Sequence, residues 1–108
     1  MNLEVHPDAL EELGYAFLFY ETQVPRLGFQ FLTAVEEGFH RILLDPQAWT
    51  ILQHGKSPAH RCLIRRFSFG LIYKIKEKKI VIVAITHLSR EPGYWKKRPE
   101  SLDKRKKS

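Results

Sequence analysis

The sequence predicts a single α+β domain in which a short strand and an α-helical hairpin precede a three-stranded antiparallel sheet. Three observations indicate this. Apolar residues recur at helical spacing over the first 45 residues, apolar runs of strand length follow between residues 61 and 87, and no long polar or glycine-rich stretch interrupts the 108 residues. A chain of this length can build one compact core, so we expect one domain over residues 1–98.

The first half of the chain predicts a strand followed by two helices. Apolar and polar residues alternate at residues 2–6, which is typical of a short strand. Apolar residues at helical spacing then occupy residues 8–22 and, after a break at Pro25, residues 27–45. The second helix must end before Pro46, because the residue before a proline resists helical geometry. The short connection between the helices predicts an antiparallel hairpin.

The second half predicts the sheet. Residues 46–60 contain two prolines and a glycine without periodicity, so we expect a loop. Strands are expected at residues 61–67, 70–76 and 79–87, and a two-residue polar turn joins the last two into a hairpin. The last strand is apolar on both faces, which suits a central strand. The helical hairpin should cover one face of this sheet, and the basic tail at residues 99–108, which has no apolar face, should be disordered.

Charge is distributed unevenly along the chain. Residues 1–59 contain three Lys or Arg and eight Asp or Glu, whereas residues 60–108 contain fifteen and four. A basic second half favours an anionic partner, such as a phosphate backbone, the ribosome or an acidic protein segment. The alternative is a basic surface that is merely solvated.

Several classes of function are disfavoured. The chain has no basic, apolar leader and no apolar run longer than a strand, so we expect a cytoplasmic protein without a membrane partner. Cys62 is the single cysteine and the histidines lack ligand spacing, so we expect no metal and no cofactor. Neither a glycine-rich phosphate loop nor a Gly-x-Ser-x-Gly turn is present.

Two residues near the end of the last strand are candidates for chemistry. Cleavage of RNA without metal needs a base, an acid and cations around the phosphorus. His87 is the candidate titrating group, and Arg90 is placed to clamp a phosphate. Each has a structural alternative, since the His87 ring can bond local backbone groups and Arg90 can bond carbonyls of the next turn. One histidine without a visible partner favours the structural role for His87.

The sheet itself is expected to carry a cationic surface. Alternation along the first of the three strands places Cys62 and Ile64 on the helix-covered face, and it leaves Arg61 and Arg65 on the open face. Two lysines of the next strand should lie beside these arginines. We therefore expect four cations on one open surface, either as a binding surface or as a solvated face: Arg61, Arg65, Lys74 and Lys76.

Two adjacent aromatics and three cations follow the last strand. Tyr94 and Trp95 precede Lys96, Lys97 and Arg98. Aromatics beside cations can stack a base and hold its phosphate, as in surfaces that bind single strands. The alternative, which the small size of the domain favours for Trp95, is that its ring packs back onto the sheet and fixes the end of the chain. Both roles can hold, because the two rings need not face the same way.

The order of elements and the stretch RRFSFGLIYKIKEKKIVIVAITHLSREPGYWKKR at residues 65–98 resemble the RelE/ParE superfamily of toxins from type II toxin-antitoxin, or plasmid stabilisation, operons. The similarity extends from HPDALEEL near the start, through Asp45-Pro46, to Arg98. The strand IVIVAITH, followed by Arg90, Pro92 and Trp95, is most similar to the ParE branch.

The resemblance implies a β-α-α-β-β-β fold and a partner antitoxin, acidic and partly disordered, that folds over the toxin. ParE-like members poison DNA gyrase and are not known as nucleases, which makes a growth-inhibiting gyrase toxin the leading hypothesis. It implies that the segment from Arg90 to Arg98 contacts gyrase or shapes the contact surface. We expect the target-binding residues among Arg61, Arg65, Lys74, Arg90, Trp95, Lys96, Lys97 and Arg98.

Two other functions are compatible with the sequence. RelE-like members cut messenger RNA on the ribosome, and by resemblance the RNase roles fall on Arg61, Arg65 and Arg90 as cations, His87 for proton transfer and Tyr94 as the aromatic. The third hypothesis is a nucleic-acid-binding module without toxicity.

Overall fold

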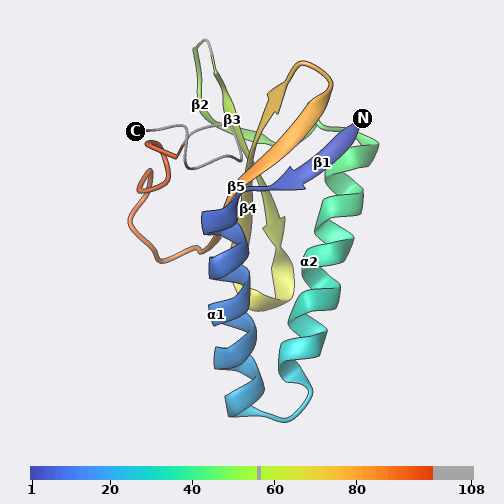
Figure 1. The fold of residues 1–108 in the computed structure, drawn as a ribbon, viewed down its shortest axis with the longest axis vertical. Helices are drawn as coiled ribbons and strands as arrows, with labels where there is room; N and C mark the ends of the chain where they lie inside the picture. Colours follow the sequence, from blue (N-terminus) through green and yellow to red (C-terminus); the bar gives the residue numbers. More distant parts are fainter. Residues whose placement is uncertain (56, 99–108) are drawn as a thin grey trace.

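The computed structural model describes residues 1–55 and 57–98, so the predicted disorder of residues 99–108 lies outside the described residues. The predicted α+β class and the order of a strand, two helices and then strands are confirmed, with one strand added (Figure 1). The elements are β1 (Asn2–Val5), α1 (Pro7–Gln23), α2 (Leu27–Leu44), β2 (Thr50–Gln53), β3 (Ala59–Ile64), a 3₁₀ turn (Arg65–Phe67), β4 (Phe69–Lys76) and β5 (Lys79–His87).

Both predicted helices are confirmed, and local chemistry sets their ends. The side chain of His6 accepts a hydrogen bond from the Asp8 backbone N–H at 3.0 Å, which caps the start of α1. The connection to α2 passes through Arg26 in the left-handed region at a φ of 75°. The Glu21 carboxylate accepts hydrogen bonds from the backbone N–H groups of Arg26 at 2.8 Å and Gly28 at 2.9 Å, which fixes the turn of the hairpin.

The sheet is larger than predicted and is mixed rather than antiparallel. Its strand order is β1-β5-β4-β3-β2, with β1 parallel to β5 and the other pairs antiparallel. The predicted loop at residues 46–60 is wrong where it includes β2 and the start of β3. An edge strand of four residues whose side chains are mostly exposed shows no alternation of apolar and polar residues, so its sequence carries no strand signal. The interior position of β5 confirms the prediction of a central strand.

The hairpin covers one face of the sheet, and the two faces carry separate cores (Figure 1). Cys62 and Ile64 lie on the helix-covered face, as predicted. An irregularity in the pairing of β4 with β5 opposes Ile72 to Ala84 and Tyr73 to Ile82, which leaves Val83 as an extra residue. This bulge reverses the alternation beyond it. His87 was expected on the face of Val81 and Val83, and it lies instead on the helix-covered side, edge-on to Phe69 with ring centroids 5.3 Å apart.

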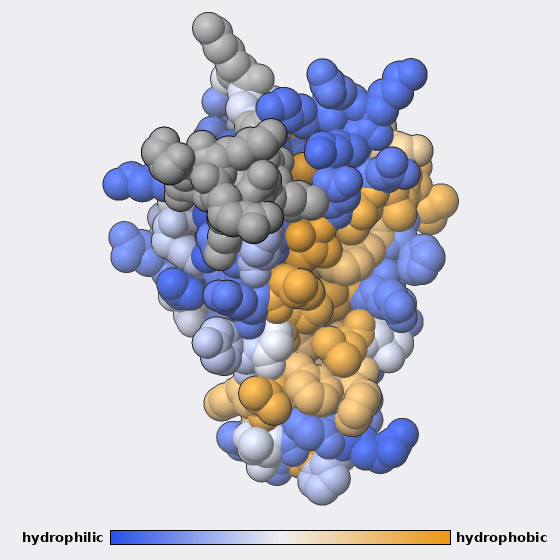
Figure 2. Space-filling view, viewed as in Figure 1, coloured by the Kyte–Doolittle hydropathy of each residue, from blue (hydrophilic) through white to orange (hydrophobic). Residues whose placement is uncertain are grey.

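The face that carries the hairpin retains exposed apolar side chains. Figure 2 shows a broad apolar strip along this face, bordered by hydrophilic groups. Large apolar or aromatic side chains that are exposed on the two helices include Leu10, Tyr15, Phe19, Phe29 and Leu44. A surface of this kind usually marks a place where another molecule binds. Neither helix among the described residues is both long and apolar enough to cross a membrane.

Candidate functional site

The chain after β5 folds back over the open face of the sheet as an irregular segment, which we call the C-terminal strap (residues 88–98). Short-range backbone bonds shape it, among them Lys96 N–H to the Gly93 carbonyl and Arg98 N–H to the Trp95 carbonyl, both at 3.0 Å. Gly93 has a φ of 81°, a conformation that favours glycine. The strap therefore follows a defined path, and two of its side chains fix that path.

Trp95 is the first fixed point. Its ring is only 5% exposed and belongs to the open-face core with Ile72, Val81, Val83 and Ala84. This is the packing role that the sequence favoured, and it corrects the expectation that Trp95 contacts a target directly. Burial of the Trp95 ring therefore holds the neighbouring residues of the strap against the sheet.

Arg98 is the second fixed point. Its guanidinium forms a bidentate pair with the Glu12 carboxylate at 3.0 and 3.1 Å, donates to the Val83 carbonyl at 2.8 Å, and lies 3.6 Å from an Asp8 oxygen. Burial alone would lower the pKa of Arg98, but the hydrogen bond and the charge of Glu12 raise it above its ordinary value. The side chain of Arg98 thus joins the strap to α1, and a contact of Arg98 with a target stays a prediction.

Glu12 of α1 connects these groups, and the sequence argument missed it. Besides Arg98, its carboxylate accepts hydrogen bonds from the Ile85 backbone N–H at 2.9 Å and from the Tyr94 hydroxyl. A sequence signal for it exists. Ala9, Glu12 and Ala16 are spaced three and four apart, so they share the helix face that small residues bring close to the sheet. An acid on that face requires a partner.

Tyr94 is held by the same network. Its ring contacts the guanidinium of Arg90 at 3.9 Å and that of Arg98 at 5.0 Å from the ring centroid. Burial, and then the hydrogen bond to Glu12, raise the pKa of Tyr94 above its ordinary value, so its hydroxyl keeps its proton at neutral pH. The stacking places Arg90 on Tyr94 rather than on carbonyls of the following turn.

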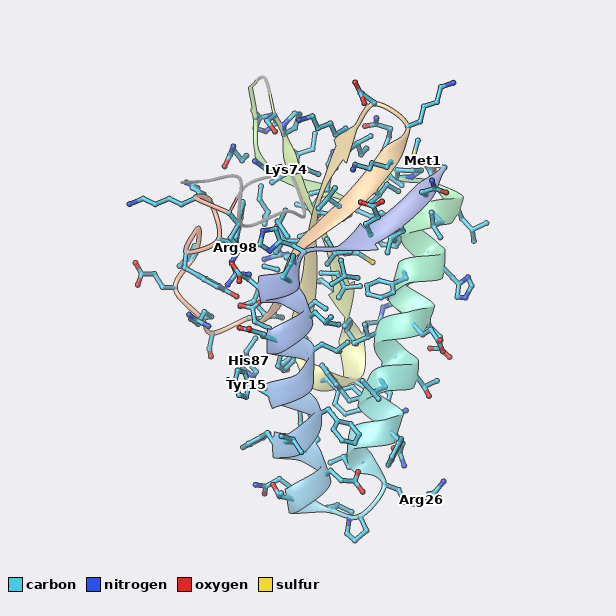
Figure 3. All side chains as sticks on the ribbon, in the orientation of Figure 1. Met1, Tyr15, Arg26, Lys74, His87 and Arg98 are labelled. Atoms are coloured by element: carbon cyan, nitrogen blue, oxygen red, sulfur yellow. The ribbon has the colours of Figure 1, made fainter. Side chains whose placement is uncertain are left out.

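His87 is exposed where the strap begins. Its Nδ1 accepts a hydrogen bond from the Ser89 backbone N–H at 3.1 Å and lies 2.7 Å from the Ser89 hydroxyl oxygen. The sequence analysis considered such a structural role for His87, in which its ring bonds local backbone groups instead of taking part in catalysis. Figure 3 shows His87 beside Tyr15 of α1, while Arg98 lies at the first turns of the same helix.

The four cations predicted on one open surface do not gather there. β3 ends at Ile64, and Arg65 lies in the 3₁₀ turn beside Glu37 and Arg41 of α2. Ser68, at a φ of 55°, then turns the chain into β4, so the expected strand does not extend to residue 67. Lys74 is only 7% exposed, which is wrong for a surface cation, and Arg61 remains on the open face.

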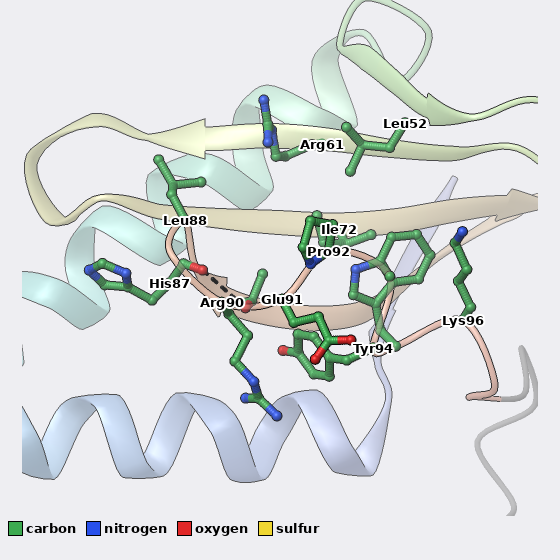
Figure 4. A pocket seen from close by; sticks show the side chains of 13 residues that line it. Leu52, Arg61, Ile72, His87, Leu88, Arg90, Glu91, Pro92, Tyr94 and Lys96 are labelled. Carbon is green, nitrogen blue, oxygen red and sulfur yellow. Dashed lines mark hydrogen bonds between the residues drawn. The ribbon is translucent and has the colours of Figure 1, made fainter.

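Six of the predicted residues do line one cavity. This strap cavity has a volume of about 220 Å³ between the strap and the open face of the sheet (Figure 4). Apolar side chains such as Ile72 and Pro92 line it together with polar groups at its rim. The predicted residues among its lining are Arg61, His87, Arg90, Tyr94, Trp95 and Lys96. Lys97 is exposed on the strap but does not line the cavity.

A second, larger hollow lies on the other side of the strand end. This α1 groove has a volume of about 390 Å³ and is mostly apolar. Tyr15 and Phe19 of α1 and Phe69 and Ile85 of the sheet line it, together with the charged residues Glu12 and Arg90. His87 and Arg90 line both hollows. No cluster of three or more metal-ligating side chains occurs within residues 1–55 and 57–98.

Comparisons with known proteins agree with this architecture. Residues 3–92 match the family described as the ParE toxin of the type II toxin-antitoxin system, parDE. A solved chain from the chromosomal ParDE toxin-antitoxin system of P. aeruginosa has the same fold, with a TM-score of 0.72 at 16% sequence identity. The match covers 82% of this chain and 97% of that chain. A search of curated proteins finds no match.

The family match covers most of the chain, including both helices, the whole sheet and the start of the strap. The chain therefore belongs to the ParE toxin family of type II toxin-antitoxin systems.

Proposed function

We propose that this protein arrests growth in the cytoplasm by acting on DNA gyrase, and that a cognate antitoxin, acidic and partly disordered, neutralises it. The match to the ParE family over residues 3–92 carries the proposal. The form of the strap supports it. Trp95 and Arg98 fix the backbone, so the exposed cations between and beside them are held in one arrangement before any target binds.

The cations available to a target are Arg90, Lys96 and Lys97, all exposed on the strap. In this proposal these three contact gyrase, while Trp95 and Arg98 shape the contact surface from beneath. Residues 90–98 thus have both roles expected from the sequence, since some side chains contact gyrase and others shape the contact surface.

Gyrase inhibition is tested with purified protein in a DNA supercoiling assay. Inhibition of supercoiling, or accumulation of cleaved DNA, at near-stoichiometric toxin is the expected result. Full supercoiling in the presence of a molar excess of folded toxin contradicts the proposal. The same preparation should leave messages intact on translating ribosomes.

The alternative is a RelE-like endonuclease that cuts messenger RNA on the ribosome. One observation favours it: Arg61, His87, Arg90 and Lys96 line the same cavity. Against it, the Tyr94 hydroxyl is bonded to Glu12 and the His87 ring to Ser89, so neither group is poised for proton transfer. Codon-positioned cuts that disappear in His87→Ala and Arg65→Ala would establish the endonuclease. Overexpression without any growth arrest would favour a binding module instead.

The α1 groove is the proposed antitoxin site. Its lining is mostly apolar and it is open to solvent. Its acid Glu12 is already paired with Arg98, so the charge of Arg90 suits an acidic segment. Folding of such a segment onto the groove removes apolar surface from water, so calorimetry should give a negative heat-capacity change. A heat-capacity change of zero would contradict coupled folding on this surface.

Two phenylalanines on the hairpin provide a matched test of this location. Phe19 lines the α1 groove and is 58% exposed, whereas Phe29 lies on α2 and is 53% exposed. Phe19→Ala should weaken antitoxin binding by about tenfold or more, and Phe29→Ala by less than about twofold. Equal effects of the two variants would move the antitoxin away from the groove.

A further inference from the structure

The part of the open sheet face that the strap leaves uncovered carries a compact apolar surface around one arginine. We call it the Arg61 patch, and it consists of Leu52, Arg61, Leu63, Gly70 and Leu88. The three leucines are 39%, 42% and 44% exposed and come from β2, β3 and the first residue of the strap. In Figure 4, Leu52 and Leu88 lie on either side of Arg61.

Gly70 is the reason that Arg61 lies flat on the sheet. It is paired with Leu63 across the β3–β4 ladder. A Cβ atom at Gly70 would lie 3.0 Å from Arg61 Cδ and 3.5 Å from Leu88 Cδ2. The missing side chain therefore makes room for the aliphatic part of Arg61 between two leucines.

The guanidinium of Arg61 has an unsatisfied buried N–H in the described part of the chain, as that of Arg41 does. Its Nε is buried and has no hydrogen-bond partner among the described residues. By contrast, Arg66 bonds the side chain of Gln30 at 3.1 Å, and Arg98 bonds Glu12. A buried N–H without an acceptor costs stability, and arginine is one of the residues enriched in binding hot spots.

The charges around the patch specify an acidic occupant. The adjoining strap cavity is lined by the cations Arg90 and Lys96, against the single acid Glu91. The exposed apolar groups are leucines, while the tryptophan of this face is 5% exposed, so no indole is offered to stack a nucleic-acid base. These features fit a peptide better than RNA. A cavity of about 220 Å³ is also smaller than the roughly 300–1,000 Å³ of drug-sized ligand pockets, and so suits a side chain.

We propose that the Arg61 patch binds an acidic peptide segment of a protein partner, which places a carboxylate on the Arg61 guanidinium and an adjacent apolar side chain in the strap cavity. A carboxylate can accept two parallel N–H bonds from a guanidinium. The site lies on the face opposite the helical hairpin and is separate from the α1 groove. It does not depend on whether gyrase is the target.

The test is a titration of the ¹⁵N-labelled full chain, followed by the backbone amide signals. The probe is a synthetic peptide of alternating glutamate and leucine, and its control has glutamine at every glutamate. The glutamate peptide should shift the amides of the Arg61 patch, and the glutamine peptide should bind at least about tenfold more weakly. Equal binding of the two peptides, or shifts confined to other surfaces, would overturn the proposal.

Two variants distinguish a specific contact with Arg61 from a general effect of the net charge of the protein. Arg61→Gln should weaken the glutamate peptide by about tenfold, whereas Arg66→Gln, which removes the same charge on the hairpin side, should change it by less than about twofold. Leu63→Glu adds an acid to the exposed rim of the patch and should abolish binding while the melting temperature stays close to that of wild type. If Arg66→Gln weakened binding as much as Arg61→Gln, the peptide would be responding to net charge and not to Arg61, which would overturn the proposal.

Nucleic acid is the remaining competitor for this surface. A single-stranded RNA oligonucleotide of matching length is added to the labelled chain under the same salt conditions. The proposal predicts that it leaves the patch amides unchanged and does not displace the glutamate peptide. Tighter binding of the oligonucleotide at these amides would identify a nucleic-acid surface and refute the peptide site.

Discussion

Glu12 shows how much of this site depends on single residues. One carboxylate receives hydrogen bonds from a guanidinium, a phenol and a backbone N–H of β5. It is 15% exposed and its arginine partner is 16% exposed, so solvent screens the pair far less than a surface salt bridge. The group joins α1, the sheet and the strap in one network.

Glu12→Gln should therefore destabilise the protein by about 2–3 kcal/mol, because it leaves the Arg98 guanidinium partly buried without its counter-charge. The matched control is Glu11→Gln, an exposed position on the same helix, which should change stability by less than about 0.5 kcal/mol. Urea unfolding at neutral pH measures both. Similar midpoints for the two variants would show that the pair contributes nothing.

Buried tyrosines predict loss of stability in alkali. Burial is the largest cause that raises the pKa of Tyr20, Tyr73 and Tyr94 above the ordinary 10.0. A tyrosine whose pKa is raised in the folded state contributes its full stabilisation below about pH 10. This stabilisation is lost as the pH rises from there through the raised pKa. Unfolding free energy should therefore fall as the pH rises above about 10. Tyr73→Phe, which also loses the bond to the Pro46 carbonyl at 2.5 Å, should show a smaller fall over that range; an unchanged fall would count against this origin.

At the scale of elements, amphipathic helices were predictable and irregular strands were not. Both helices have a continuous apolar stripe and a proline at a boundary, so their limits could be read closely. β5 is apolar on both faces, and no pattern within it marks the bulge at Val83 that moves His87 to the other face. The 3₁₀ turn at residues 65–67 was expected to continue the strand, because neither glycine nor proline marks a break between Arg61 and Phe67.

The strap depends on tertiary contacts, which sequence patterns do not contain. Packing of Trp95 was favoured in advance because a large ring in a small domain gains most from burial. The pairing of Arg98 with Glu12 joins positions 86 residues apart, and no local pattern connects them. Arg61, Arg90 and Lys96 were all predicted as binding residues, and they line one cavity. Arg65 is not among them because it lies in the 3₁₀ turn, and Lys74 is not because its side chain is buried.

Trp95→Ala tests the strap as an element. Removal of the ring from the open-face core should cost about 3–5 kcal/mol. Hydrogen exchange should then show faster exchange across residues 88–98 than in α2, because the strap loses one of its two fixed points. If protection in the strap stays at the wild-type level, the ring does not hold it.

At the scale of the whole molecule, the acidic half forms the helical hairpin and the basic half forms most of the sheet and the strap. The folded chain thus presents opposite charge on different sides. The α1 groove lies where the two halves meet, between α1 and the end of β5 with Arg90. The positive potential of the basic half should therefore steer an acidic antitoxin towards this groove, with faster association at low salt.

Stopped-flow association measures this steering. Between about 0.05 and 0.5 M NaCl the association rate constant for toxin and antitoxin should fall by about tenfold or more, while the dissociation rate constant changes little. An association rate that is independent of salt would show that the charge asymmetry does not guide binding.

The central claim is that the chain acts on gyrase through the exposed cations of a strap that is fixed in advance. The most direct measurement compares two double variants in the supercoiling assay. Lys96→Ala with Lys97→Ala removes two strap cations, and Lys76→Ala with Lys78→Ala removes two exposed lysines near the β4–β5 turn. The account predicts at least about a tenfold loss of inhibition for the strap variant and wild-type inhibition for the turn variant. Equal inhibition by both variants, with both folded, would contradict it.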